Sequence, residues 1–112
     1  MVKRYIAILT FVLLALVIRK VQATTTAVNV TQGQTLILKC PGKPVILWGD
    51  NNDNVLAHGV TVNGNIALSN RLAVTQDHHL VINNFSYDDP LIYLCETNEP
   101  KRFSFQVNIM RK

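Results

Sequence analysis

The fold of this chain is decided by the stretch LIYLC at residues 91–95, in which apolar residues run up to a cysteine. Because successive side chains of a β-strand point to opposite faces, Leu91, Tyr93 and Cys95 are predicted to face inward, and Ile92 and Leu94 outward. A second stretch, LILKC at residues 36–40, has the same alternation and ends in the other cysteine. The two stretches therefore predict two half-buried strands, each with a cysteine on its inner face.

The rest of residues 24–112 shows the same period of two and no helical period. Clusters of Gly, Asn, Asp and Pro separate the alternating segments, as expected for turns. The pattern predicts seven to nine short strands, near residues 28–30, 36–40, 45–48, 55–57, 60–62, 72–74, 80–82, 91–95 and 103–109. Such a series is typical of an all-β antiparallel sandwich or barrel.

Residues 1–23 have the composition of a secretory signal peptide. A basic pair at residues 3–4 precedes a nearly unbroken apolar run over residues 6–18, and VQA at residues 21–23 fits a cleavage site. The run is shorter than the roughly 20 apolar residues that span a bilayer. A retained signal anchor stays open as an alternative, because RK at residues 19–20 places positive charge where signal peptides rarely carry it.

The excess of basic residues belongs to this first segment. The whole chain has 11 Lys and Arg residues against seven Asp and Glu residues, a formal net charge of +4. Residues 1–23 hold four of the basic residues and none of the acidic ones, which leaves a neutral domain of residues 24–112. A neutral domain gives no electrostatic support for binding nucleic acid or an anionic membrane. We therefore expect one secreted, extracellular domain with no nucleic-acid partner and no membrane insertion after signal cleavage.

The cysteines and sequons agree with export. Two cysteines, Cys40 and Cys95, predict a disulfide in an exported protein, whereas two free thiols are the alternative if export is wrong. A loop of this length would stabilise the fold by about 4 kcal/mol in the chain-entropy model. The triplets Asn29-Val30-Thr31 and Asn84-Phe85-Ser86 predict glycans on Asn29 and Asn84.

The set Cys40, Trp48 and Tyr93-Leu94-Cys95 resembles the immunoglobulin superfamily, and most closely its variable-type or intermediate-type domains. The resemblance covers about residues 27–110. It implies an immunoglobulin-like antiparallel β-sandwich with one inter-sheet disulfide, Cys40–Cys95, and with Trp48 packed against it. It also implies that the Tyr93 hydroxyl donates a hydrogen bond back to the corner that precedes its strand.

Two more positions fit this resemblance, and three depart from it. Arg71 and Asp89 lie where variable-type domains carry an ion pair that closes one end of the sandwich. However, Trp48 follows the first cysteine more closely than usual, and Leu91 replaces the family's Gly or Ala. The final strand lacks the Gly-x-Gly bulge of antibody variable domains. These departures argue against an antigen-receptor chain and leave the exact subtype open.

The most informative prediction for function is an outward apolar face. If Ile46 and Trp48 point inward, Val45 and Leu47 point outward, as Ile92 and Leu94 do on the later strand. The two strands are neighbours in the immunoglobulin fold, on the sheet formed by its C, F and G strands. The predicted partner-binding face therefore consists of Val45, Leu47, Ile92 and Leu94. Soluble monomers rarely leave such a patch uncovered, although a neighbouring strand or ordinary β-propensity is an alternative explanation.

Other polar clusters give weaker signals. The run Asp50 to Asn54 offers oxygens for Ca²⁺ but lacks the spacing of a calcium loop, so a solvated turn is favoured. The triplet Asp77-His78-His79 is also better explained as a turn, because adjacent strand residues point to opposite faces. No serine lies in a nucleophile motif and no paired carboxylates stand out. We expect no enzyme activity, no cofactor and no metal site.

The sequence therefore favours protein–protein recognition. The first hypothesis is a secreted single-domain ligand, decoy or adhesion-type protein that uses its C–F–G face to bind another immunoglobulin-like or cell-surface protein, or itself. The alternative is a soluble immune-type recognition factor that binds microbial or glycan surfaces through polar loops such as Asp50 to Asn54. A third hypothesis is a structural domain with no discrete partner.

Overall fold

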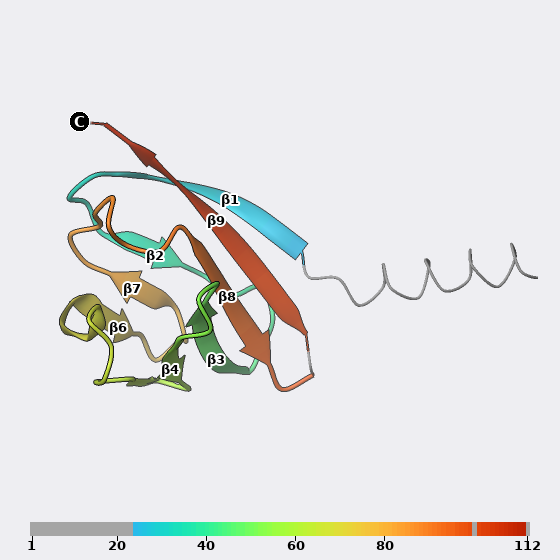
Figure 1. Ribbon diagram of the computed structural model, residues 1–112. Helices are drawn as coiled ribbons and strands as arrows, with labels where there is room; N and C mark the ends of the chain where they lie inside the picture. The colour runs from blue at the N-terminus through green and yellow to red at the C-terminus, as the bar shows by residue number, and fades with distance from the viewer. Residues whose placement is uncertain (1–23, 100, 112) are drawn as a thin grey trace, which may run out of the picture.

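The computed structural model describes residues 24–99 and 101–111, so the predicted signal peptide lies outside the described residues. Two β-sheets face each other (Figure 1): a six-stranded sheet in the order β1-β9-β8-β3-β4-β5 and a three-stranded sheet in the order β2-β7-β6. The strands are β1 Thr24–Thr31, β2 Leu36–Leu38, β3 Val45–Asp50, β4 Val55–His58, β5 Thr61–Val62, β6 Leu72–Val74, β7 Leu80–Ile82, β8 Ile92–Thr97 and β9 Arg102–Met110. A 3-10 turn, η1 Ser69–Arg71, precedes β6. Among the described residues, no helix has the length and apolar character needed to cross a membrane.

Strand β1 pairs with β9 in parallel along its whole length, from Thr24 opposite Phe103 to Thr31 opposite Met110, without a register shift. All the other strand pairs are antiparallel. Figure 1 shows β1 and β9 as a long ribbon at one side of the sandwich. The nine strands agree with the seven to nine that the alternating pattern predicts.

The core lies between the two sheets. A disulfide between Cys40 and Cys95 links the two sheets, as expected. Trp48 is fully buried, its ring centroid lies 5.8 Å from that of Phe105, and its indole N–H donates to the carbonyl oxygen of His78 at 3.1 Å. This hydrogen bond satisfies the one polar atom of the side chain, so the indole is buried without an unpaired donor.

The ends of β3 and β8 carry short loops that are tied to each other. The Asn98 backbone N–H donates to the Pro44 carbonyl oxygen at 3.1 Å. A Cβ atom at Gly42 would lie 2.8 Å from the side chains of both Thr97 on β8 and Phe103 on β9, so the chain packs closely on these strands only because residue 42 is glycine. The two loops at this end of the sandwich are therefore short and held together.

Two expectations for the strand that carries Cys95 are wrong. Leu91 is 45% exposed, because it lies in the turn after Pro90 and β8 begins only at Ile92. The Tyr93 hydroxyl is buried but has no hydrogen-bond partner among the described residues, so it does not donate to the preceding corner. That corner is instead held by Asp89, whose carboxylate accepts from the Ser86 backbone N–H at 2.9 Å.

This difference makes the effect of Tyr93→Phe predictable. Because the hydroxyl makes no protein hydrogen bond, its removal should leave the free energy of unfolding unchanged or raise it by up to about 1 kcal/mol. Burial raises the pKa of Tyr93 above its ordinary value, with further contributions from Asp89 and Asp50. The unfolded chain therefore loses this proton first, and wild-type stability should fall above about pH 10, where the unfolded tyrosine ionises.

Urea unfolding of wild type, Tyr93→Phe and the exposed control Tyr87→Phe at neutral and alkaline pH measures both effects. Only Tyr93→Phe should reduce the alkaline loss. A cost of more than about 1 kcal/mol at neutral pH would mean that the hydroxyl makes a stabilising hydrogen bond after all.

Candidate protein-binding face

The outer face of the six-stranded sheet follows from strand alternation and register. Opposite the buried Tyr93 and Cys95, β8 turns Ile92, Leu94 and Glu96 outward. The register then aligns three rows across the sheet: Gln106 with Ile92; Ser104 with Leu94, Gly49 and Val55; and Arg102 with Glu96, Leu47 and His58. Three of the four predicted face residues, Leu47, Ile92 and Leu94, lie in these rows and are called here the outer-face cluster.

Val45, the fourth predicted residue, does not belong to this face. It is only 4% exposed and packs in the core, whereas its neighbour Ile46 is 44% exposed. The cause is a β-bulge: Val45 pairs with Thr97 and Leu47 with Glu96, so Ile46 is an extra residue that has no partner on β8. The bulge interrupts the alternation of period two, so Val45 points into the core and Ile46 points outward, the opposite of the prediction.

Glycine flattens the centre of the outer-face cluster. Gly49 lies directly opposite Leu94, and a Cβ atom at position 49 would lie 3.6 Å from a Leu94 methyl carbon. The Leu94 side chain therefore reaches over the glycine backbone and covers it. Ile92 is 37% exposed, while Leu47 and Leu94 are half-buried by their neighbours, so the surface is apolar but low in relief.

Polar groups surround this apolar centre. Arg102 lies 3.8 Å from the Glu96 carboxylate on the row of Leu47, and His58 is exposed at the other side of Leu47. On the β9 side, the hydroxyls of Ser104 and Thr25 are hydrogen-bonded at 3.0 Å. An apolar centre with a polar rim is the usual composition of a protein-binding surface.

Sequence reasoning missed Ile46 and Gly49. Ile46 adds an exposed apolar side chain beside Leu47, but only the bulge reveals it. Gly49 comes directly after the predicted strand of residues 45–48, and the observed β3 continues through it to Asp50. Glycine inside a strand often marks a close approach of another group, but the predicted strand ended too early for this signal to apply. Neither residue changes the position of the face; together they extend it along β3.

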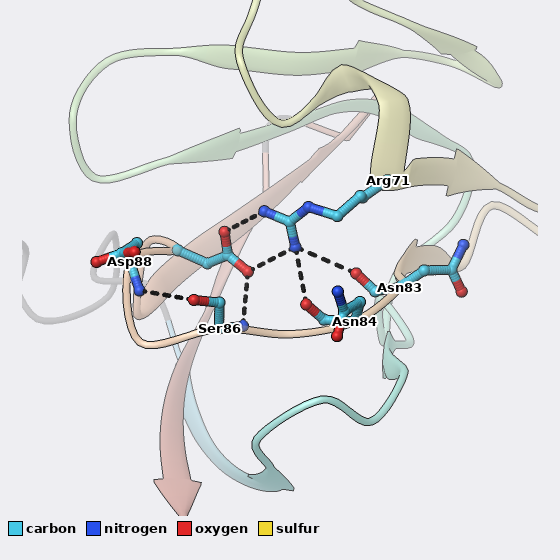
Figure 2. A network of polar contacts seen from close by, with 6 residues as sticks. Arg71, Asn83, Asn84, Ser86 and Asp88 are labelled. Carbon is cyan, nitrogen blue, oxygen red and sulfur yellow. Dashed lines mark hydrogen bonds and ion pairs between the residues drawn. The ribbon is translucent and has the colours of Figure 1, made fainter.

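The ion pair expected between Arg71 and Asp89 is present at one end of the sandwich. The guanidinium donates to both carboxylate oxygens, at 2.9 and 2.5 Å, and Asp89 is buried. Figure 2 shows that Arg71 also reaches the backbone carbonyl oxygens of Asn83 and Asn84, at 3.1 and 3.0 Å. Its hydrogen bond with Asp89 raises the pKa of Arg71 above its ordinary value. Both terminal nitrogens of the guanidinium are engaged within the fold, by Asp89 and by two backbone carbonyl oxygens, so the network joins the turn before β8 to η1 and acts as a structural link.

The polar clusters are turns. The Asp50 carboxylate accepts from the backbone N–H groups of Asn52 and Asn54 and from the Asn54 amide, at 2.9 to 3.1 Å, so its oxygens are used within the turn. His78 has a φ of 63° in a turn closed by the Thr75 N–H bond to the His79 carbonyl oxygen. In the described part of the chain, no three His, Cys, Asp or Glu side chains gather closely enough to hold a metal ion.

The two sequons lie at different places on the surface. Asn29 is exposed on the outer face of β1, where the Asn108 amide donates to its side-chain oxygen at 3.4 Å. Asn84 is exposed in the turn after β7, with a φ of 53°. Glycans on Asn29 and Asn84 stay predictions, and the two positions place them on the six-stranded sheet and at the base of the sandwich respectively.

No protein-family model matches the chain. No curated protein matches it either. Solved structures do match. The first immunoglobulin domain of ZIG-8, solved as a homodimer, is 19% identical with a TM-score of 0.63, over 80% of this chain and 82% of that one.

Two further matches have the same character. The first immunoglobulin domain of Dpr11, solved bound to DIP-gamma, is 20% identical with a TM-score of 0.59, over 78% of this chain and 100% of that one. The first immunoglobulin-like domain of human CD48 is 12% identical with a TM-score of 0.64, over 80% of this chain and 85% of that one. In addition, two strands, β4 and β5, extend the six-stranded sheet beyond β3, which is the arrangement of variable-type domains. The chain therefore has the immunoglobulin fold, with variable-type topology.

Proposed function

We propose that this chain is a secreted recognition protein that binds another immunoglobulin-like domain, or a second copy of itself, through the outer-face cluster. The observation that carries this proposal is the apolar centre of Leu47, Ile92 and Leu94 around Gly49, with charged and hydroxyl groups at its border. Burying one such side chain contributes about 1.5–3 kcal/mol. Secretion is supported by the disulfide, which forms in oxidising compartments.

An immunoglobulin-like partner fits this surface for two reasons. The face is low in relief and lies on a sheet, so it complements another sheet better than a narrow cleft or a long loop. The ZIG-8 domain was solved as a homodimer and Dpr11 in complex with DIP-gamma, and both share this fold. A role as ligand, decoy or adhesion-type protein follows, and none of these roles needs a catalytic group.

Polar-loop recognition of microbial or glycan surfaces has less support. The Asp50 carboxylate, at the start of the turn, is buried and engaged by Asn52 and Asn54. The loops at the opposite end are short and joined through Asn98 and Pro44. What these loops lack is an apolar centre of the kind that the outer-face cluster provides: the side chains of residues 50–54 are all polar.

Leu94→Glu tests the proposed face. The full chain is secreted from a eukaryotic host, and its binding is measured against a panel of immunoglobulin-like ectodomains, against itself and against a panel of microbial glycans. We expect at least a tenfold loss of affinity, because the variant removes about 1.5–3 kcal/mol of apolar burial and leaves a charge at the interface centre.

The matched control is Ile37→Glu, which makes the same kind of change at a 51% exposed position on the three-stranded sheet. It should bind like wild type, and circular dichroism should show that both variants are folded. Binding that Leu94→Glu leaves unchanged would exclude the outer-face cluster. If that unchanged binding is to microbial glycans, the polar-loop function is favoured.

A further inference from the structure

The edge strand β1 has an unpaired side. It is the terminal strand of the six-stranded sheet, and among the described strands only β9 pairs with it. Alternate backbone N–H and C=O groups of an edge strand point away from the sheet, where another strand can bind them. In the described residues, backbone hydrogen bonds outside the sheet involve this strand only at Thr31, which accepts from the Gln34 N–H at 3.0 Å.

This edge lacks the features that usually protect one. Natural edge strands are shortened, bent by bulges, or carry charged residues or proline. The other three sheet edges are short: β5 has two residues, and β2 and β6 have three each. Strand β1 has eight residues, TTTAVNVT, with no charge and no proline, and its pairing with β9 has no bulge. It is therefore the one long unprotected edge among the described strands.

We propose that the free edge of β1 pairs antiparallel with β1 of a second copy of this chain. The two copies would be related by a twofold axis that is perpendicular to the sheet and passes through Ala27 or Val28. Because side chains alternate between the two faces of a strand, this axis pairs each outward-facing residue with an outward-facing residue of the other copy. Since the strand carries no charge, such self-pairing brings no like charges together. The two six-stranded sheets then form one continuous sheet.

The pairing has a consequence for binding that rests on the proposed function. An axis perpendicular to the sheet leaves the outer faces of both copies on the same side. Two outer-face clusters would then point toward one surface, and a bivalent molecule binds a partner-bearing surface more tightly than a single domain without any new contact. Edge pairing itself uses backbone groups of β1 and does not require Leu94.

The experiment removes the predicted glycan first. Asn29 lies on β1, so a glycan there would obstruct a second copy, and the secreted chain is made with Asn29→Gln. Its mass is measured by light scattering over the widest concentration range at which it stays soluble. We expect a rise towards twice the monomer mass. Adding Leu94→Glu should leave this rise, whereas adding Ala27→Lys should abolish it. The two lysines would lie directly opposite each other with the axis at Ala27, or diagonally across the new strand pair with the axis at Val28.

Two controls separate edge pairing from other self-association. Ala73→Lys makes the same exchange at an exposed position of β6, an edge strand of the other sheet. This variant should show the same rise in mass with concentration as the Asn29→Gln chain. Hydrogen exchange should show that the amides of β1 become protected as the concentration rises. The proposal is overturned if the mass stays monomeric at all concentrations. It is also overturned if Ala27→Lys keeps the rise, or if Leu94→Glu alone removes it; that last result would support face pairing instead.

Discussion

Replacing Cys40 and Cys95 together with alanine is expected to lower the free energy of unfolding by about 4 kcal/mol. The disulfide links residues separated by 55 positions, and opening it restores the conformational freedom of a long loop to the unfolded chain. A domain of this size has a total stability of the order of 5–15 kcal/mol, so the loss would remove a large part of it. Urea unfolding at neutral pH measures the change in free energy.

Reduced wild-type protein is the matched control, because it opens the same loop and keeps both sulfur atoms in the core. Cys95 is fully buried and Cys40 nearly so, so alanine also leaves a small cavity. An equal loss in the reduced protein and in the double variant would assign the effect to the crosslink. A reduced protein that unfolds at the same urea concentration as the oxidised one would contradict the prediction.

The features that the sequence predicts correctly have local or chemically specific signals. The strand pattern comes from alternation within short segments, and the Cys40–Cys95 pair needs only two cysteines in an oxidising compartment. The Arg71–Asp89 ion pair could be predicted because a resemblance to variable-type domains gives both positions. The turns at residues 50–54 and 75–79 follow from residue types that favour tight or left-handed backbone.

The errors arise where contacts distant in sequence decide the outcome. Val45 faces the core because the β3–β8 register slips at Ile46, and a rule of strict alternation has no signal for an extra residue. The loop before β3 is held by a hydrogen bond from Asn98, more than fifty positions away, which the local pattern does not reveal. The parallel pairing of β1 with β9 likewise depends on the two ends of the described chain.

The second large effect concerns the network in Figure 2: Arg71→Met is expected to cost about 3 kcal/mol. Asp89 is buried and would keep a single donor, the Ser86 N–H, after losing both hydrogen bonds from the guanidinium. Removing one member of a buried ion pair costs about 3–5 kcal/mol, and the lower end applies because the Arg71 side chain is 28% exposed. Urea unfolding at neutral pH measures this loss.

Two comparison variants identify its cause. Arg71→Lys keeps the charge but loses the planar fork that binds both Asp89 oxygens and the carbonyl groups of Asn83 and Asn84, so it should lie between wild type and Arg71→Met. The double variant Arg71→Met/Asp89→Asn should recover part of the loss, because it no longer buries an uncompensated charge. If Arg71→Met cost less than about 0.5 kcal/mol, as ordinary surface substitutions do, the ion pair would not stabilise this end of the sandwich. A double variant less stable than Arg71→Met would show instead that Asp89 acts mainly through the Ser86 N–H, as the anchor of the turn before β8.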